Sequence, residues 1–370
     1  SMASMVEALG LSLPGNAAIP AVDAARKVLA QLSGKRIVDM VRENLTPSVI
    51  LTRAAFENAI KVNAAIGGST NFVIHLLAIA GRVELPLTID DFDTLSKNIP
   101  LLANLQPSGK YFMEDLYYAG GIPAVMKELS NELHLDCLTA NGKTVRQNIE
   151  KATVYNREII STMEEPFNAL AGFIVLHGNL CEGGGVMKPS AADPKLMQHT
   201  GKAVVFENIE DYKARIDDPD LEVDENSVLV LKHVGPKGYP GMPEVGNMGL
   251  PKKLLEKGIK DMVRISDGRM SGTGFGTVVL QISPEAAVNG TLALVQNGDL
   301  IQLDAKGRQL NLLVDESELQ KRRAALPVPV NPFHRGYANL FVSYVEQAHL
   351  GADFDFLKGK SGSEVLRDSH

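Results

Sequence analysis

The sequence has only two cysteines in 370 residues, Cys137 and Cys181, too few for a disulfide framework. This scarcity is typical of a reducing compartment, so we expect a cytoplasmic protein. It also lacks any apolar run near the roughly 20 residues that a membrane helix needs, and we expect neither a membrane span nor a secretion signal. The net charge of −7 includes no basic block, which argues against a nucleic-acid partner. A small molecule is the expected ligand.

The chain opens almost directly on an amphipathic segment that ends at Gly10, with no strand before it. We expect that Ser1 and Met2 are foreign to the natural sequence and that a natural segment upstream is absent. A genuine short start is the alternative.

Residues from about 20 to 165 carry mainly helical signals. In the segment 21–32, Val22, Val28 and Leu32 fall on one stripe with Ala25 and Leu29. This is the spacing of a helix packed on a core. We therefore expect that helix to be part of the protein interior.

The sequence GGSTN at 67–71 combines two helix-breaking glycines with three capping residues, Ser69, Thr70 and Asn71. An almost wholly apolar stretch follows, which predicts a buried helix. The free N–H groups and positive dipole at such a helix start suit a carboxylate or a phosphate. Simple capping is the plainer interpretation of the same residues.

After residue 165 the pattern changes to short apolar runs separated by glycine, proline and Asn-Gly turns, which predict strands. Asn297-Gly298 and Lys306-Gly307 divide the segment 295–314 into three runs, as in antiparallel hairpins. We predict a domain boundary near residue 165. Residues 1–165 would form a helical or α/β part, and residues 166–370 a β-barrel-like part with a few helices.

The segment ISDGRMSGTGFGT at 265–277 has the composition of an active-site turn. A phosphate loop would need a lysine after its glycines, and a dinucleotide fingerprint would need a different glycine spacing and a following helix. The hydrolase elbow fails because Arg269, not glycine, stands two residues before Ser271. What remains is a serine on a turn with little side-chain bulk around it, which could approach a ligand closely.

A serine hydroxyl acts as a base only when a histidine or a metal ion lowers its pKa, and this segment has no histidine. Upstream, the glycine- and proline-rich segment VGPKGYPGMPEVGNMGLP holds one acid, Glu244. A carboxylate on a rigid loop is a plausible ligand for a hard cation. A plain surface loop with one glutamate is the alternative.

Several long motifs, in order along the chain, resemble one enzyme family. They are AAIGGSTNFVIHLLAIAGR, LHGNL with VMKPSA, GPKGYPGMPEVGNMGLP, VRISDGRMSGTGFGTVVLQISPEAA and RGYANLFVSYVEQAHLGADFDFL. Together they are similar to the iron–sulfur dehydratases, which include dihydroxy-acid, phosphogluconate and pentonate dehydratases. Within that family the motifs around Pro243 and Ser271 look like the sugar-acid branch.

The resemblance implies an α/β fold class, with residues 1–165 as the C-terminal part of a cluster- and metal-binding α/β/α domain. The implied reaction removes water from a 2,3-dihydroxy sugar acid, an aldonate such as L-arabinonate, to give a 2-keto-3-deoxy acid. Ser271 would be the base on the C2 proton, with Thr273 beside it and Glu244 as a magnesium ligand. An iron–sulfur cluster, expected to be of the 2Fe–2S type, would bind the C3 hydroxyl as a Lewis acid.

The same resemblance suggests two further hypotheses, each about residues that contact the substrate. Arg269 could hold the substrate carboxylate, the alternative being a salt bridge to Asp267. Ser69, Thr70 and Asn71 could bind another anionic or hydroxylated part of the substrate. The family also implies a homodimer or a dimer of dimers.

The chain departs from the family pattern in its cysteines. Cys137 and Cys181 do not align with the family's cluster ligands, so we expect no cluster ligand in this chain, no assembled cluster and no activity of the chain alone. Three more interpretations stay open. They are a dihydroxy-acid dehydratase of branched-chain amino-acid synthesis, a cluster-free protein that only binds a sugar acid, and a magnesium-only acid dehydratase with a lysine or histidine base.

Overall fold

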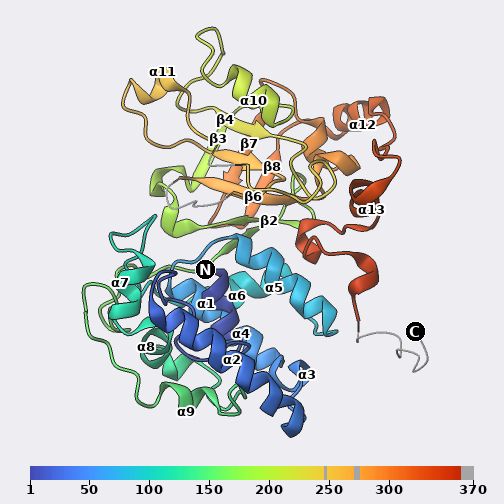
Figure 1. The fold of residues 1–370 in the computed structure, drawn as a ribbon. Helices are drawn as coiled ribbons and strands as arrows, with labels where there is room; N and C mark the ends of the chain where they lie inside the picture. Colours follow the sequence, from blue (N-terminus) through green and yellow to red (C-terminus); the bar gives the residue numbers. More distant parts are fainter. Residues whose placement is uncertain (246–247, 271–275, 360–370) are drawn as a thin grey trace, which may run out of the picture.

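The computed structural model describes residues 1–245, 248–270 and 276–359. Figure 1 shows a helical part below and a part built around a sheet above, with the amino terminus near their junction. The helices of the lower part are α1 (Met2–Ala8), α2 (Ala24–Glu43), α3 (Pro47–Ile50), α4 (Arg53–Ala65), α5 (Asn71–Arg82), α6 (Ile89–Ser96), α7 (Met113–Tyr118), α8 (Gly121–Glu128) and α9 (Val145–Ile149).

Helix α5 lies in the core of the helical part, as its apolar sequence predicts. Phe72 in its first turn is fully buried and meets Phe92 edge-on at a centroid distance of 5.7 Å. It also stacks on Phe173 at 6.4 Å, just before the first strand. Phe92 belongs to α6. One buried cluster contains residues of α5, α6, β1 and β2, so the start of α5 packs against the first strands of the sheet.

Helix α2 differs from the prediction, because none of its residues is buried. Val22 before the helix is 97% exposed, and Val28 within it is 54% exposed. The helix is held partly by polar contacts, among them Arg36 Nε to the carbonyl oxygen of Ala140 at 2.6 Å. Periodicity indicates which face of a helix is apolar, but not whether another element lies opposite that face.

The second part contains a sheet that nearly closes into a barrel, which confirms the predicted fold class. Its strands are β1 (Ile174–Leu176), β2 (Gly184–Met187), β3 (Gln198–Phe206), β4 (Val228–Leu231), β5 (Arg264–Ser266), β6 (Val278–Ser283), β7 (Leu300–Asp304) and β8 (Gln309–Leu312). They lie in the order β1-β2-β6-β5-β4-β3-β7-β8. A single bridge between His177, just after β1, and Gln309 in β8 joins the two edges.

The four central strands β6, β5, β4 and β3 run parallel, and the outer neighbours pair antiparallel. One buried cluster draws side chains from every strand and is therefore the barrel interior. A second cluster, with Val204, Phe206 and Leu229, covers the outer face of the parallel strands and includes residues of α10 (Ile209–Arg215) and α11 (Lys252–Leu255). Burial on both faces explains the continuous apolar runs of these strands.

Two helices follow the barrel strands, α12 (Glu316–Ala325) and α13 (Gly336–Tyr344). Short 3-10 turns complete the described structure: η1 (Ser130–Glu132), η2 (Pro189–Ala191), η3 (Pro194–Leu196), η4 (Ala286–Val288), η5 (Thr291–Leu294), η6 (Ala348–Leu350) and η7 (Asp355–Leu357). The hairpin predicted at Lys306-Gly307 is confirmed as β7 and β8. The run before Asn297 is the 3-10 turn η5 rather than a strand, because its residues fold over the end of the barrel and pack into its interior cluster.

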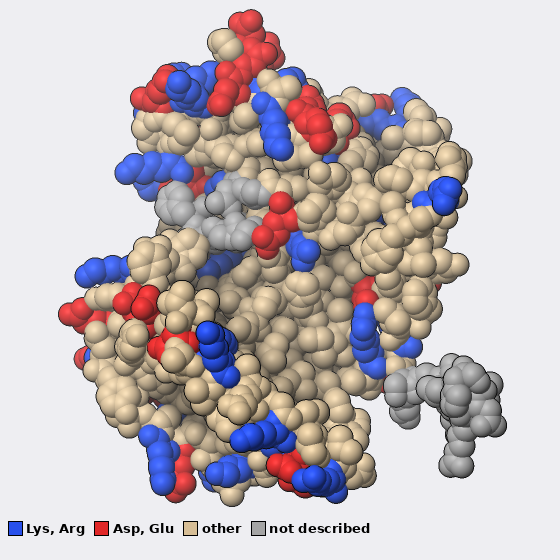
Figure 2. All heavy atoms as spheres, in the orientation of Figure 1, with Lys and Arg blue, Asp and Glu red and all other residues tan. Residues whose placement is uncertain are grey.

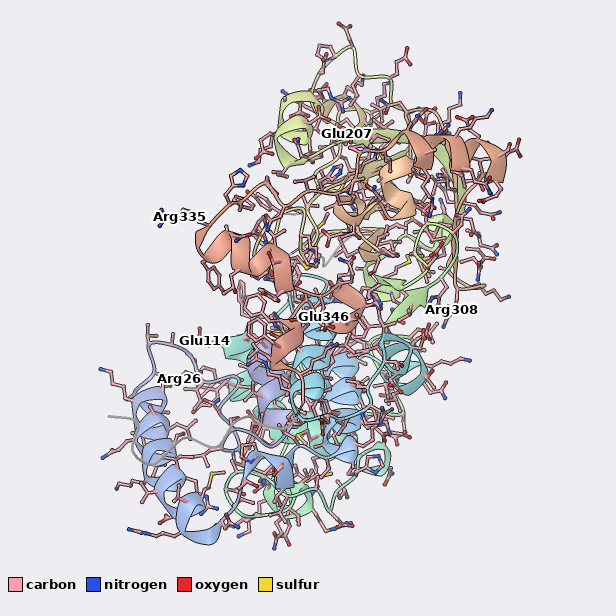
Figure 3. All side chains as sticks on the ribbon, turned by 90° about the vertical axis from the view of Figure 1, so that its right-hand side faces the viewer. Arg26, Glu114, Glu207, Arg308, Arg335 and Glu346 are labelled. Carbon is pink, nitrogen blue, oxygen red and sulfur yellow. The ribbon has the colours of Figure 1, made fainter. Side chains whose placement is uncertain are left out.

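Contacts between the two parts are both apolar and ionic. Arg308 beside β8 pairs with Asp93 of α6, with Nε 2.6 Å from the carboxylate (Figure 3). The domain boundary near residue 165 stays a prediction, since the first buried cluster continues through Phe173, Val175 and Val186. Within the described ranges, no helix has the length and apolarity that a membrane crossing requires.

Candidate functional site

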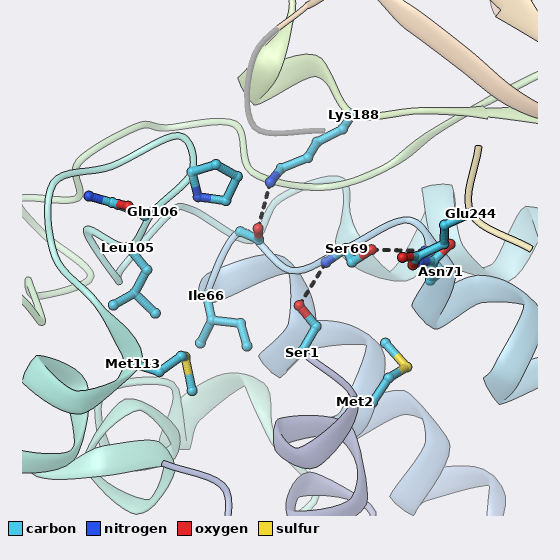
Figure 4. Close-up of a pocket in the computed structure, with 12 residues that line it drawn as sticks. Ser1, Met2, Ile66, Ser69, Asn71, Leu105, Gln106, Met113, Lys188 and Glu244 are labelled. Atoms are coloured by element: carbon cyan, nitrogen blue, oxygen red, sulfur yellow. Dashed lines mark hydrogen bonds between the residues drawn. The ribbon is translucent and has the colours of Figure 1, made fainter. Parts of the chain in front are cut away.

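A cavity of about 300 Å³ opens where the helical part meets the barrel. Its polar lining comes from five separate segments, namely α1, the turn before α5, the segment 105–113, the residue after β2 and the loop after β4 (Figure 4). The polar side chains that line it are Ser1, Ser69, Asn71, Gln106, Lys188 and Glu244. The cavity therefore joins three of the motifs on which the sequence prediction depends, those that contain Asn71, Lys188 and Glu244.

The turn between α4 and α5 is fixed by a close approach at Gly68. A Cβ atom there would lie 1.9 Å from Asn63 Oδ1, so only glycine fits while Asn63 stays where it is. Gly67 has φ +60°, which also favours glycine. The two predicted helix-breaking residues thus shape the turn that leads into the cavity.

Helix capping accounts for only some of the polar side-chain atoms of residues 69–71. Ser69 Oγ accepts a hydrogen bond from the Asn71 N–H at 3.2 Å. Thr70 Oγ1 and Asn71 Oδ1 are buried, and neither has a hydrogen-bond partner among the described residues. Since buried polar atoms are nearly always satisfied, and Asn71 lines the cavity, its oxygen favours a ligand at this helix start. Thr70 is not among the lining residues, and its predicted role in substrate binding stays a prediction.

Glu244 enters the cavity from the loop after β4. Asn71 Nδ2 donates a short hydrogen bond to Glu244 Oε1. The backbone around Glu244 pairs with that of Arg269 in a parallel bridge, and the Val245 N–H donates to the Arg269 carbonyl at 3.2 Å. Because β4 and β5 are parallel neighbours, their following loops emerge at one edge of the sheet, which brings these residues together.

Two buried acids hold the beginning of the Glu244 loop. Asp267 accepts hydrogen bonds from the N–H groups of His233 and Val234, and burial raises the pKa of its carboxyl to about 6. Glu285 accepts from the N–H of Gly238 at 2.8 Å, and burial, reinforced by Asp267, raises its pKa to about 7. These contacts hold the beginning of the loop, residues 233–238, against the residues that follow β5 and β6.

The side chain of Arg269 lies in a neighbouring cavity rather than in the one lined by Glu244. Its Nε donates to the Met242 carbonyl at 2.5 Å, and Nη1 lies 3.2 Å from His75 Nε2. No salt bridge joins it to Asp267 in the part of the chain that the structure describes. Burial lowers the pKa of His75, and the nearby Arg269 charge lowers it further, while the Glu244 charge opposes this shift. A role for Arg269 in carboxylate binding stays a prediction.

Lys188 and Gln281 contact the site but were not identified as site residues from the sequence. Lys188 follows the fully buried strand β2, and its Nζ donates to the Gly67 carbonyl at 2.5 Å. Burial lowers the pKa of its ammonium group to about 8. Gln281 in β6 donates from Nε2 to the Thr70 carbonyl at 2.9 Å. The signal in the sequence was a lysine directly after an all-apolar strand, where a charge would have to be buried.

Ser271 and Thr273 lie in 271–275, outside the described residues. Their predicted roles therefore stay predictions. Arg269, two positions before Ser271, is described, and its backbone pairs with that of Glu244 in a parallel bridge.

The expected cofactors are an iron–sulfur cluster and magnesium, whose usual ligands are cysteine thiolates and carboxylates. Cys137 is half-buried in the helical part, while Cys181 lies inside the barrel and its thiol donates to the Leu176 carbonyl. Within 1–245, 248–270 and 276–359, no three His, Cys, Asp or Glu side chains group as a metal site. Iron–sulfur clusters need several thiolate ligands, so these residues do not fit one. Among the described residues that line the cavity, Glu244 is the one carboxylate, and its role as a magnesium ligand stays a prediction.

The surface near this junction is mixed in charge. Figure 2 shows Lys, Arg, Asp and Glu interspersed over both parts on the face it presents. A strong field of one sign, which would steer a polyanion, is not visible on that face.

Comparison with known proteins gives consistent matches over nearly the whole chain. Residues 1–148 match the dihydroxy-acid/6-phosphogluconate dehydratase N-terminal profile, and residues 158–352 match its C-terminal profile. The chain is 56% identical to the L-arabinonate dehydratase of Rhizobium leguminosarum bv. trifolii over 98% of its length and 63% of that relative. It is 53% identical to the L-arabonate dehydratase of Azospirillum brasilense over its full length and 65% of that relative.

A more distant match is the dihydroxy-acid dehydratase of Ignicoccus hospitalis, at 42% identity over 96% of the chain and 64% of that relative. The chain thus spans less than two thirds of the length of these relatives.

Proposed function

Because the chain belongs to the dihydroxy-acid/6-phosphogluconate dehydratase family, we propose that it contributes to a hydro-lyase acting on a sugar acid. The substrate is a 2,3-dihydroxy aldonate such as L-arabinonate, and the product is a 2-keto-3-deoxy acid. The observation that carries this proposal is the higher identity to relatives named for L-arabinonate, 56% and 53%, than to the dihydroxy-acid dehydratase at 42%.

The elimination breaks the C2–H and C3–O bonds of the aldonate. The C2 proton passes to Oγ of Ser271 in its alkoxide form, and the serine then gives this proton to the departing C3 hydroxide, which leaves as water and restores the alkoxide. The enol that remains tautomerises to the keto acid. Thr273 supports the serine, while the Asn71 oxygen, which lacks a partner in the described structure and belongs to a residue of the cavity lining, binds a substrate hydroxyl group.

Glu244 serves as a magnesium ligand in this proposal, and Asn71 orients it. The 2Fe–2S cluster and magnesium expected from the resemblance need ligands beyond those of the described residues. We accordingly propose that the chain by itself is inactive, and that activity belongs to a longer protein comparable in length with the relatives. A cytoplasmic location and a homodimer or dimer of dimers remain part of the same proposal.

A dihydroxy-acid dehydratase of branched-chain amino-acid synthesis is the second candidate, favoured only by the match at 42% identity. No specific observation favours a cluster-free sugar-acid-binding protein or a magnesium-only dehydratase.

The test is an assay of a full-length protein carrying this chain, reconstituted anaerobically with iron, sulfide and magnesium. L-Arabinonate, xylonate, fuconate, gluconate and 2,3-dihydroxyisovalerate are compared for formation of a 2-keto-3-deoxy or 2-keto acid. We expect turnover of an aldonate and much weaker turnover of the branched-chain substrate. Preference for the branched-chain acid would favour the second candidate, and binding without turnover would favour the sugar-acid-binding protein. Robust turnover by the 370-residue chain alone would refute its proposed inactivity.

A further inference from the structure

Lys188 is a buried positive charge without a carboxylate partner in the described structure. The residue is only 6% exposed, and its ammonium donates to a neutral acceptor, the Gly67 carbonyl. No Asp or Glu of the described ranges forms an ion pair with it within 4.0 Å. A charge removed from water costs several kcal/mol unless an opposite charge offsets it. The position of Lys188 therefore calls for a negative group from outside these residues.

The other deeply buried lysine of the barrel provides a contrast. Lys232, at 3% exposed, pairs with Glu207 Oε1 at 2.9 Å and also donates to the Ala293 carbonyl at 3.3 Å. That ammonium has its counter-charge within the fold and does not line the Glu244 cavity. The difference between the two lysines is the missing partner at Lys188.

Lys188 also has the right place for a ligand contact. It lines the cavity with Asn71 and Glu244, and among the described side chains of that lining it is the only cation. Figure 4 shows its side chain extending from the barrel to the turn before α5. The bond to Gly67 holds one N–H and leaves two N–H groups of the ammonium for another acceptor.

Arg269, the residue first expected to hold the substrate carboxylate, is engaged elsewhere. Both its Nε and Nη1 contact protein atoms, and its side chain lines the neighbouring cavity. An aldonate carries a single permanent negative charge, at its carboxylate, and its hydroxyl groups cannot neutralise an ammonium ion. The substrate group that can neutralise Lys188 is therefore the carboxylate.

We infer that Lys188 binds the carboxylate of the sugar acid through its buried ammonium. This inference rests on the proposed function, because the ligand is the aldonate of that reaction. Lys188 lies in the motif VMKPSA, to which the sequence analysis gave no role, and it is then a substrate-binding residue that orients the acid end of the substrate against the turn at Gly67.

The test measures binding of L-arabinonate and of its uncharged counterpart L-arabinitol by calorimetry, in the full-length reconstituted protein. A Ser271→Ala background prevents turnover during the titration. Lys188→Met removes the charge in a similar volume, Lys188→Arg keeps it, and Lys232→Met is the matched control at a buried lysine outside the cavity. Melting temperatures show whether each variant folds.

We expect Lys188→Met to weaken L-arabinonate binding by at least about 30-fold, the size typical of a lost charge-assisted hydrogen bond. Binding of L-arabinitol should change by less than about threefold, with Lys188→Arg recovering most of the L-arabinonate affinity and Lys232→Met leaving it unaltered. Unchanged arabinonate binding in Lys188→Met, or an equal loss for both ligands, would overturn the inference. If the unsubstituted protein neither binds nor dehydrates any aldonate, the proposed function fails first. If the unsubstituted protein binds and dehydrates an aldonate but Lys188→Met does not weaken binding, the proposed function holds and only the role of Lys188 is wrong.

Discussion

Asn71 and Glu244 are 173 positions apart in the sequence, and the Asn71 side-chain amide donates directly to the Glu244 carboxylate. This bond joins the first turn of α5 to the loop after β4, so a helix start of the lower part orients an acid presented by the barrel. The remaining Asn71 oxygen has no partner among the described residues. Asn71 thus joins the two parts through its amide nitrogen, while its amide oxygen is left for a ligand.

Replacing Asn71 should impair the proposed metal ligand rather than the fold. In the full-length protein we expect Asn71→Ala to weaken magnesium activation by about 10- to 100-fold, the usual effect of losing a group that orients a metal ligand. Activity measured against magnesium concentration checks this.

Asn148→Ala is the matched control, because Asn148 also exchanges side-chain hydrogen bonds, with Asn141 and Thr139, but far from the cavity. If both variants respond alike to magnesium, Asn71 has only a structural role.

Gly68 should not tolerate a side chain. In Gly68→Ala the new Cβ would overlap the buried side chain of Asn63, which would have to shift within the core, and we expect a loss of about 1–3 kcal/mol in the free energy of unfolding. Gly34→Ala in the exposed helix α2 has open space and should instead stabilise by about 0.5–1 kcal/mol. Chemical denaturation measures the free energy of unfolding of both variants. Equal changes in Gly68→Ala and Gly34→Ala would contradict this account of the turn.

The buried acid Glu285 should make stability depend on pH. Its folded pKa is raised from 4.5 to about 7, so its stabilising contribution is complete below pH 4.5 and is lost as the pH rises to 7. Glu285→Gln removes this titration and should make the decline between pH 5 and 7 shallower by up to about 1.4 kcal/mol per pH unit. Urea melts across that range measure the slopes, and parallel slopes would show that Glu285 is ionised throughout.

Binding of the aldonate should weaken at alkaline pH. Only the charged form of Lys188 attracts a carboxylate, and burial lowers the pKa of this lysine to about 8 in the ligand-free protein. Affinity should therefore be constant below about pH 7 and fall as the pH rises through 8. Glu244 is the other charged side chain that lines this cavity in the described structure. Lys188→Arg separates the contributions, since arginine stays charged and should abolish the fall if Lys188 causes it.

Much of the fold and part of the site could be predicted from the sequence. The apolar run after GGSTN required a buried helix, and the β7–β8 hairpin followed from its turn residues. The exposure of Val28 on α2 could not be predicted, because periodicity contains no information on what lies opposite a face. The roles of Lys188 and Gln281 depend on the contact between the barrel and the α5 turn, a tertiary contact that local spacing does not encode.

The central claim is that this chain carries the base of a sugar-acid dehydratase, and one measurement tests it most directly. The initial rate of 2-keto-3-deoxy acid formation from L-arabinonate is compared between the reconstituted full-length protein and its Ser271→Ala variant. The account predicts product from the first and a rate at least about 10³-fold lower from the variant, since the residue that takes the C2 proton is lost. Comparable rates in the two proteins, or no product from any aldonate, would contradict it.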